Sequence, residues 1–248
     1  MKSLKFLVAA AMMMASATGF AQFANSGAAS SSSNNGYVAS SYDRFGVSYN
    51  SYKYTFDVDD ADDLGMTGIG AEWIHGFGLS STTPIYIESG LKFIYAFKSE
   101  SLDDIKAGGK TYELTRKYTM MNIAVPINLA YRFTLPGNSD VSITPFTGIT
   151  LKYNIAMKSK DTADDDFYDY MDWSKKEIEE FEESTDYFDK DDMGDSKNTY
   201  KRFQFGWQIG AGLSYKALYL GLSYNLDFTE AAKKTKTSNF AVTIGYNF

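Results

Sequence analysis

The sequence predicts an all-β protein, a transmembrane up-and-down antiparallel β-barrel of eight strands with short periplasmic turns and long outer loops. Three observations support this fold class. The C-terminal segments alternate with a strict period of two, no segment is long and apolar enough for a membrane helix, and short connections alternate with long ones.

The alternation is clearest from Leu218 to Phe228 and from Phe240 to Phe248, where every second residue is large and apolar. The residues between them are mostly Gly, Ser, Asn and Thr. A period of two indicates strands with two different faces. The coat of a soluble protein would carry charge, so we expect the small polar face to line a lumen and the apolar face to contact lipid.

Composition agrees with a single barrel domain. The chain has 248 residues, a net charge of −7 and no Cys, which excludes disulfides and lipid attachment at a cysteine. No segment after the N-terminus has about 18 consecutive apolar residues, so a helical membrane protein is excluded. The 19 Tyr, 18 Phe and 3 Trp suit the two membrane–water boundaries. The acidic balance argues against nucleic-acid binding.

The N-terminus resembles a secretory signal peptide. Lys2 and Lys5 precede a short apolar run, and the small residues Gly19 and Ala21 stand at the −3 and −1 positions of a cleavage site. We therefore expect residues 1–21 to be removed and residues 22–41, rich in Ser, Asn and Gly, to form a flexible periplasmic leader. The barrel would then occupy residues 42–248.

Eight strand-like segments follow in the barrel region: 44–56, 65–79, 84–98, 117–133, 140–157, 200–215, 218–228 and 240–248. In the first, the apolar phase changes between Tyr49 and Tyr52, which predicts a β-bulge near Asn50 and Ser51. Pro126 and Pro145 argue mildly against regular pairing in the fourth and fifth segments.

The connections after the second, fourth and sixth segments are short, whereas the others are long. This is typical of outer-membrane barrels, with tight turns in the periplasm and long loops outside. An even number of strands places both termini in the periplasm. Ten strands is the alternative, if the connection 158–199 contains a hairpin.

With these features, the chain resembles the small outer-membrane β-barrel domain family of Gram-negative bacteria, the OmpA/PorT-like eight-stranded barrels. The resemblance covers residues 42–248 and depends on the signal peptide, the run Met121–Leu129 and the C-terminal Tyr246-Asn247-Phe248. It implies that Tyr246 and Phe248 form a signal for the barrel-assembly machinery. The alternative is that Phe248 merely ends a strand. Membership implies location and fold and leaves the activity open.

Charged residues at inward positions form a first candidate site: Glu72, Glu88, Lys92, Arg132 and Lys152. The interior of an eight-stranded barrel is only just wide enough for side chains. Because an unpaired buried ion is costly, we expect a salt-bridged lumenal charge network that fixes the register. A gated pore lined by the same groups is the alternative.

The connection 158–199 is a long acidic extracellular loop. It has 16 acidic residues against 6 lysines, a net charge of −10, so the rest of the chain carries +3. Ser174 and Glu177 fit a capping box and predict a short helix near 174–184. The loop is either a solvated surface or a docking surface for a protein or glycan, with these aromatic residues as contacts: Tyr168, Tyr170, Trp173, Phe181 and Tyr187.

Other chemistry has weak support. The run from Asp189 resembles the start of an EF-hand loop, but Met193 and Tyr200 occupy positions that need oxygen ligands. Weak cation binding remains the alternative there and at the aspartates of 57–63. The only histidine is His75, with Ser80 five residues later, and a lone boundary histidine favours an interfacial role over lipid hydrolysis.

The sequence therefore predicts a monomeric, non-enzymatic outer-membrane protein without catalytic, cofactor or metal sites. Its expected role is structural or in surface interaction through the outer loops. A narrow channel or transporter, or a membrane component of a secretion or surface-attachment assembly, are the alternatives. Expected partners are outer-membrane lipid or lipopolysaccharide, the barrel-assembly machinery and an extracellular protein or glycan.

Overall fold

The structure is a computed structural model that describes residues 41–58, 62–80, 82–102, 104–194 and 199–248. The predicted signal peptide, and all of the predicted leader except Ser41, lie outside the described residues. Ser41 directly precedes the first strand, which begins at Tyr42.

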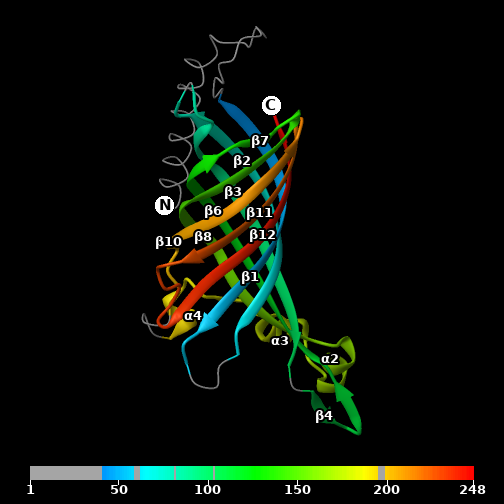
Figure 1. The fold of residues 1–248 in the computed structure, drawn as a ribbon. Helices are drawn as coiled ribbons and strands as arrows, with labels where there is room; N and C mark the ends of the chain where they lie inside the picture. The colour runs from blue at the N-terminus through cyan, green and yellow to red at the C-terminus, as the bar shows by residue number, and fades with distance from the viewer. Residues whose placement is uncertain (1–40, 59–61, 81, 103, 195–198) are drawn as a thin grey trace. The chain divides into compact units, whose positions relative to one another are not determined.

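Eight antiparallel strands close a ring in the described part of the chain (Figure 1). Their order around the ring is β1–β2–β3–β6–β8–β10–β11–β12, and β12 pairs again with β1. Their bounds are β1 Tyr42–Phe56, β2 Leu64–Gly78, β3 Ile85–Ser101, β6 Leu114–Tyr131, β8 Asn138–Ala163, β10 Phe203–Tyr215, β11 Leu218–Asp227 and β12 Thr235–Asn247. The predicted eight-stranded all-β barrel is confirmed.

The remaining elements are short and lie in the connections. They are β4 Ile105–Ala107, β5 Lys110–Tyr112, β7 Phe133–Leu135, α2 Asp165–Met171, α3 Lys175–Phe181, β9 Thr185–Asp186 and α4 Lys190–Met193. No described helix has the length and hydropathy to span a bilayer. The ten-strand alternative is wrong, because the connection after β8 contains these helices and only the two-residue β9, which pairs with Lys158 and Ser159.

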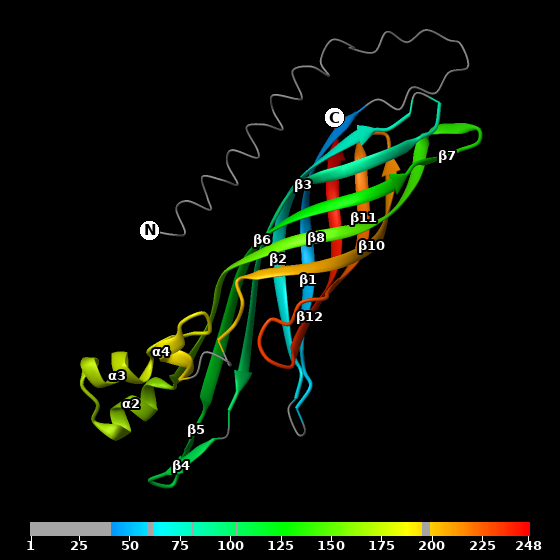
Figure 2. The same ribbon diagram turned by 90° about the vertical axis from the view of Figure 1, so that its left-hand side faces the viewer.

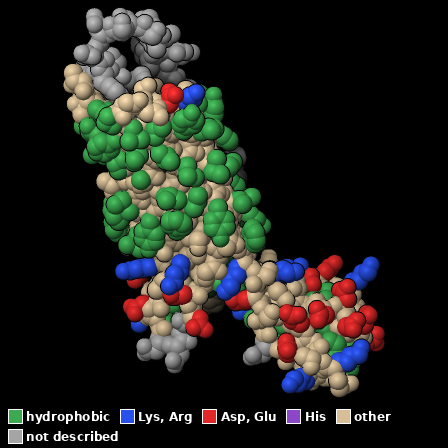
Figure 3. Space-filling model, turned by 45° about the vertical axis from the view of Figure 1, so that its right-hand side comes forward, with side chains coloured by type: hydrophobic (Ala, Val, Ile, Leu, Met, Phe, Trp, Pro, Cys, Tyr) green, Lys and Arg blue, Asp and Glu red, His purple; other side chains and the backbone are tan. Residues whose placement is uncertain are grey.

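The strands turn apolar side chains outward and polar ones inward. Val47 is 57% exposed and Ile244 is 63% exposed, while Glu88 and Gln208 are fully buried inside the ring. On the face shown in Figure 3, hydrophobic side chains cover the barrel as a broad belt, with charged groups beyond its lower edge. An apolar surface this large is unfavourable in water and matches the hydrocarbon core of a bilayer.

The predicted β-bulge near Asn50 and Ser51 is wrong. The pairing of β1 with β2 and with β12 runs without interruption through both residues. Tyr52 and Tyr54 are buried inside the ring because they continue the inward phase, and Lys53 and Thr55 are exposed outside. The change in the sequence pattern therefore marks the edge of the belt and not a change in backbone register.

An irregularity does occur at the same end of the barrel, between β6 and β8. Met121 pairs with Ala156 whereas Asn122 pairs with Asn154, so Ile155 is the additional residue of a β-bulge. The two prolines do not interrupt the ring: Pro126 is paired with Thr150, and Pro145 with Ala211.

The connections confirm the predicted alternation. Residues 79–84, 132–137 and 216–217 make short connections at one end, the turn end, whereas 57–63, 102–113, 164–202 and 228–234 make long ones at the other, the loop end. The C-terminal Phe248 lies at the turn end beside Asp43, with backbone N–H···O distances of 3.0 and 2.9 Å in the two directions.

Candidate functional site

The turn-end half of the lumen contains a chain of buried charges. The Arg44 guanidinium lies 3.2 Å from Glu88 and 3.7 Å from Glu72, and Lys92 lies 3.2 Å from the other Glu72 oxygen. Tyr42 donates its hydroxyl hydrogen to Glu88. Each ion thus has an opposite charge in contact, which offsets the cost of removing it from water.

Arg132, which the sequence groups with these charges, lies against aromatic rings. Its guanidinium is 4.4 Å from the centre of the Tyr42 ring and 5.0 Å from that of Tyr86. Cations are attracted to the faces of such rings. Arg132 therefore interacts with the aromatic residues at the turn end, and the Glu88 carboxylate is occupied by Arg44.

The loop-end half contains a second ion pair, between Lys152 and Asp227. Thr237 donates its hydroxyl hydrogen to the same carboxylate, and Lys152 Nζ lies 3.2 Å from the Thr237 oxygen. Lys152 was predicted to belong to the network, whereas Asp227 and Arg44 were not. Both occupy inward positions of their strands. Phe45 faces outward, so the alternation along β1 predicts that its neighbour Arg44 faces inward.

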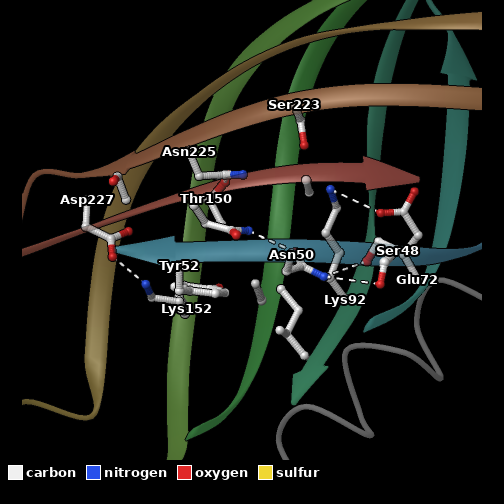
Figure 4. A pocket seen from close by; sticks show the side chains of 15 residues that line it. Ser48, Asn50, Tyr52, Glu72, Lys92, Thr150, Lys152, Ser223, Asn225 and Asp227 are labelled. Atoms are coloured by element: carbon white, nitrogen blue, oxygen red, sulfur yellow. Dashed lines mark hydrogen bonds and ion pairs between the residues drawn. The ribbon is translucent and has the colours of Figure 1, made fainter. Parts of the chain in front are cut away.

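A cavity of about 30 Å³ lies between the two groups (Figure 4). Side chains from β1, β3, β8 and β11 point into it, among them Asn50, Lys92, Lys152 and Asn225. A second cavity of about 10 Å³ lies toward the turn end. A cavity needs a volume of roughly 10–15 Å³ to hold one water molecule, so the lumen has room for a few waters.

Buried apolar clusters lie inside the barrel at both ends. At the loop end, Tyr54, Met66, Met120 and Met157 are buried together, and Tyr200 packs against them. At the turn end, buried side chains form a smaller cluster: Tyr42, Tyr86, Ala130 and Phe146. An added Cβ at Gly76 would overlap the Tyr42 ring, so inward glycines make room for these rings.

Two connections fold together beyond the barrel into a small lobe, which we define as residues 104–113 and 164–183. Figure 2 shows β4 and β5 of the first connection beside α2 and α3 of the second. Its core is aromatic, with Tyr112, Phe167 and Tyr168 buried and Trp173 and Phe181 packed against them. The ring centres of Phe167 and Trp173 are 5.6 Å apart in an edge-to-face arrangement.

The lobe begins directly where β6 and β8 extend beyond the belt. Arg116 makes a bidentate salt bridge to Asp161, with distances of 2.7 and 2.8 Å. Glu182 accepts hydrogen bonds from Lys160 at 2.8 Å and from the Tyr168 hydroxyl at 2.9 Å. The ammonium of Lys160, and then the Tyr168 hydroxyl, hold the pKa of the Glu182 carboxyl below its ordinary value.

The predicted helix near 174–184 is confirmed as α3. The Ser174 hydroxyl accepts from the backbone N–H of Glu177, and the Glu177 carboxylate accepts from the backbone N–H of Ser174 at 2.7 Å. This reciprocal capping box starts the helix. The Ser174 hydroxyl also donates to the Glu177 carboxylate at 2.7 Å, and this hydrogen bond, followed by that from the Ser174 backbone N–H, lowers the pKa of the Glu177 carboxyl.

The five aromatic residues predicted as surface contacts of the loop have different environments. Tyr168 is only 7% exposed, and Trp173 and Phe181 are half-buried in the same core. Tyr187 packs against Tyr200 at the barrel mouth, with ring centres 5.1 Å apart. Tyr170 is 49% exposed, so of the five it presents the most surface to a partner.

Tyr246 and Phe248 lie on the outer face at the end of β12. They are 54% and 68% exposed, and their ring centres are 6.5 Å apart in a stacked orientation. Both rings are therefore accessible at the turn end, on the same outer face that forms the belt.

His75 and Ser80 do not contact each other. His75 Nδ1 lies 2.9 Å from Asp43, which also accepts from the indole N–H of Trp73 at 3.1 Å. The Ser80 hydroxyl accepts from the backbone N–H groups of Thr82 and Thr83 in the β2–β3 turn. Hence Asp43 and its partners anchor the turn-end boundary of the barrel.

Two of the carboxylates that resemble an EF-hand start have local structural roles, and Asp195 lies outside the described residues. Asp189 accepts from the backbone N–H of Asp191 and caps α4, and Asp192 accepts from the backbone N–H of Asp186. Of the first-loop aspartates, Asp63 pairs with Lys53 at 2.6 Å, and 59–61 lie outside the described residues. Among the described residues, no three Asp, Glu, His or Cys side chains group around a metal position.

These features define an integral membrane β-barrel with a polar lumen. The family model for the outer membrane protein beta-barrel domain matches residues 44–231, and the chain belongs to this family. It is therefore an outer-membrane protein. No curated protein matches the chain.

Several solved structures are similar to the chain at low sequence identity. Ail, the attachment invasion locus protein of Yersinia pestis, solved with the heparin analogue sucrose octasulfate, is 14% identical, with 84% of this chain and 99% of Ail covered and a TM-score of 0.37. Neisserial surface protein A is 6% identical, with coverage of 83% and 97% and a TM-score of 0.39. The outer membrane enzyme PagL is 9% identical, with coverage of 81% and 98% and a TM-score of 0.33.

Proposed function

We propose that this protein is a non-enzymatic surface-interaction protein, in which the barrel is an anchor and the lobe contacts a partner outside the cell. The observation that carries the proposal is the aromatic core of the lobe. Tyr112 from one connection packs with Phe167 and Tyr168 from another, so two loops of the chain build one folded unit. Solvated loops without a role would not need such a core.

The orientation follows from the connections. Outer-membrane barrels have short turns in the periplasm and long loops outside. The lobe belongs to the long connections, which supports its exposure at the cell surface. A protein or glycan partner is thus accessible to the lobe without crossing the membrane.

The exposed side of α2 indicates the chemistry of the partner. Tyr170 and Met171 are 49% and 42% exposed, side by side at the end of the helix. Acidic residues surround them in the sequence and are exposed as well: Asp165, Asp166, Asp169 and Asp172. An apolar contact with a carboxylate rim is complementary to a basic protein that presents an apolar side chain among Lys or Arg.

Binding to a defined probe tests this proposal. We would immobilise the protein in nanodiscs and titrate a soluble peptide of alternating Lys and Leu, with the matching Glu and Leu peptide as a negative control. The Lys peptide should bind, and Tyr170→Ser with Met171→Ser should weaken binding about tenfold because the apolar contact is lost.

A charge-matched pair of variants separates a site from general acidity. Asp169→Asn with Asp172→Asn removes two charges beside Tyr170, whereas Glu179→Gln with Glu180→Gln removes two exposed charges from α3. Only the first pair should reduce binding several-fold. Equal losses from both pairs, or full binding after deletion of 164–183, would contradict a role for this surface.

A channel is the second candidate, because the lumen is polar and contains two cavities. The apolar clusters at both ends argue against a continuous water path. Planar-bilayer recordings distinguish the two functions. The surface-interaction proposal expects no discrete openings, whereas stable openings abolished by Glu88→Ala or Lys92→Ala would establish a pore.

A further inference from the structure

The two edges of the apolar belt carry different charges. At the turn end, Asp43 faces outward and is engaged by Trp73 and His75. At the loop end, the charged residues at outward positions of the described barrel strands are all lysines: Lys53, Lys117, Lys158, Lys160 and Lys236. Lys201 is exposed two residues before Phe203, the first residue of β10. Figure 3 shows Lys and Arg side chains along this edge, with Asp and Glu mostly farther away.

These lysines lie at the height of lipid headgroups. A strand rises about 3.3 Å per residue, so Lys236 in β12 lies about 13 Å farther along the strand than the exposed Phe240, four residues later. Lys201 comes two residues before Phe203, the first residue of β10, which is 52% exposed. A lysine extends its ammonium group away from the apolar region while its methylene stem stays beside it.

The lysines differ in whether the protein already neutralises them. Lys53 pairs with Asp63 at 2.6 Å, Lys160 with Glu182 at 2.8 Å and Lys158 with Asp186 at 3.9 Å. Lys201 and Lys236 make no ion pair with any carboxylate in the part of the chain that the structure describes. Lys117 on β6 has no ion pair among the described residues either, but of these unpaired lysines only Lys201 and Lys236 lie beside β11, so these two ammonium groups can share one anion there.

Lys201 and Lys236 flank one apolar surface. Leu226 pairs with Ser238, so Lys236 of β12 comes level with Phe228, while the backbone N–H of Lys201 donates to the Ala231 carbonyl at 2.6 Å. Both lysines therefore lie beside the connection that follows β11. Phe228, just after β11, is 57% exposed, and its ring centre is 5.7 Å from that of Phe205. Two cations thus stand beside an aromatic surface on the lipid-facing side of the barrel.

We propose that Lys201 and Lys236 bind the phosphate of an anionic membrane lipid whose acyl chain packs on Phe203, Phe205 and Phe228. Ammonium groups form charge-assisted hydrogen bonds with phosphate oxygens. The apolar belt below the lysines favours a lipid over a soluble anion, because only a lipid fills both parts of the site. The proposal concerns the barrel wall and is independent of the lobe and of its partner.

Native mass spectrometry of the folded protein in detergent tests the site. We would titrate phosphatidylglycerol and, as the zwitterionic comparison, phosphatidylcholine with the same acyl chains. The wild type should retain phosphatidylglycerol preferentially. Lys201→Gln with Lys236→Gln should reduce its bound fraction about tenfold, since each lysine near an anionic lipid surface contributes measurably to binding.

Matched controls use the neighbouring turn. Lys233 and Lys234 are exposed at the tip of the β11–β12 connection, three and two residues before Lys236. The double variant Lys233→Gln with Lys234→Gln therefore gives the same change in charge. This control should retain lipid binding, and heat-modifiable gel migration should show that every variant is folded. Equal losses in both double variants, no loss in the first, or competition by millimolar inorganic phosphate would overturn the proposal.

Discussion

The barrel and the lobe have opposite interiors. Inside the barrel, Arg44, Glu88 and Gln208 are buried, while leucines such as Leu222 are exposed on the outside. Inside the lobe, Phe167 and Tyr168 are buried, while acidic residues cover the outside. The barrel thus buries polar side chains and the lobe buries apolar ones. The difference follows from the surroundings of the outer face, which are lipid for the barrel and water for the lobe.

Strand β1 shows the reversal within a single element. Val47 and Tyr49 face outward within the belt, whereas Lys53 and Thr55 face outward beyond it. On the inner side the order is reversed, from Arg44 and Asn50 to Tyr52 and Tyr54. The backbone register is continuous, so the change occurs in the environment and not in the strand.

The largest effect is expected inside the barrel, from Glu88→Ala. Glu88 is fully buried and contacts Arg44 and Tyr42, so its loss leaves a buried guanidinium without its nearest carboxylate. We expect the free energy of unfolding to fall by about 3–5 kcal/mol in urea titrations of the folded protein.

The double variant Arg44→Met with Glu88→Met provides the control for Glu88→Ala. Replacing both charges with apolar side chains removes the unpaired ion, so it should destabilise less than either single variant. A double variant as unstable as the sum of the single ones would show that Arg44 and Glu88 contribute independently, so that the unpaired charge does not determine the cost.

The outer face of the barrel should reject a charge that the lobe tolerates. Leu222 lies in the middle of β11 and is 49% exposed toward lipid, and Leu222→Arg should cost about 2–4 kcal/mol in unfolding free energy. Glu179→Arg on the exposed face of α3 should change stability by about 0.5 kcal/mol or less. Similar costs at both positions would mean that the belt does not contact lipid.

The core of the lobe should behave as that of a small soluble domain. Phe167→Ala removes a buried ring from a core that is partly exposed, so we expect a local loss of about 2–3 kcal/mol, less than in a full core. Hydrogen exchange should increase in α2 and α3 and remain slow in the barrel strands. Faster exchange across β10–β12 would show that lobe and barrel are one cooperative unit.

The strands could be predicted from the sequence because lipid-facing positions leave a period-two signal. Leu218 to Phe228 and Phe240 to Phe248 show it without interruption, and both segments are strands of the ring. The signal failed at Tyr52, where the prediction assumed lipid outside the whole strand. Beyond the belt the strand is surrounded by water, so its apolar side chains point inward and its polar ones outward. No local sequence feature marks the position at which the belt ends.

The lumen was less predictable than the strands. The alternation along a strand identifies which charged side chains point into the lumen. It does not identify which of them form pairs between different strands. Asp227 reaches Lys152 from a strand 75 residues later, and Arg132 faces aromatic rings instead of Glu88. In the lobe, the pairing of Tyr112 with Phe167 joins two separate connections, and no periodicity links them.

The smallest effect is expected at the capping box of α3, which the sequence identified from Ser174 and Glu177. Ser174→Ala removes the acceptor for the Glu177 N–H and should destabilise the helix by about 1 kcal/mol, whereas Ser174→Asp keeps an acceptor and should be close to neutral. The pKa of Glu177 is lowered in the folded state, so its contribution is present at neutral pH and lost as the pH falls through the lowered pKa. Exchange of the α3 amides, measured from pH 7 down to about 3, should therefore show less acid sensitivity in Ser174→Ala than in the wild type, while the lumenal pairs keep the barrel unchanged. Equal acid sensitivity in both would mean that the hydrogen bonds of the capping box do not stabilise the first turn.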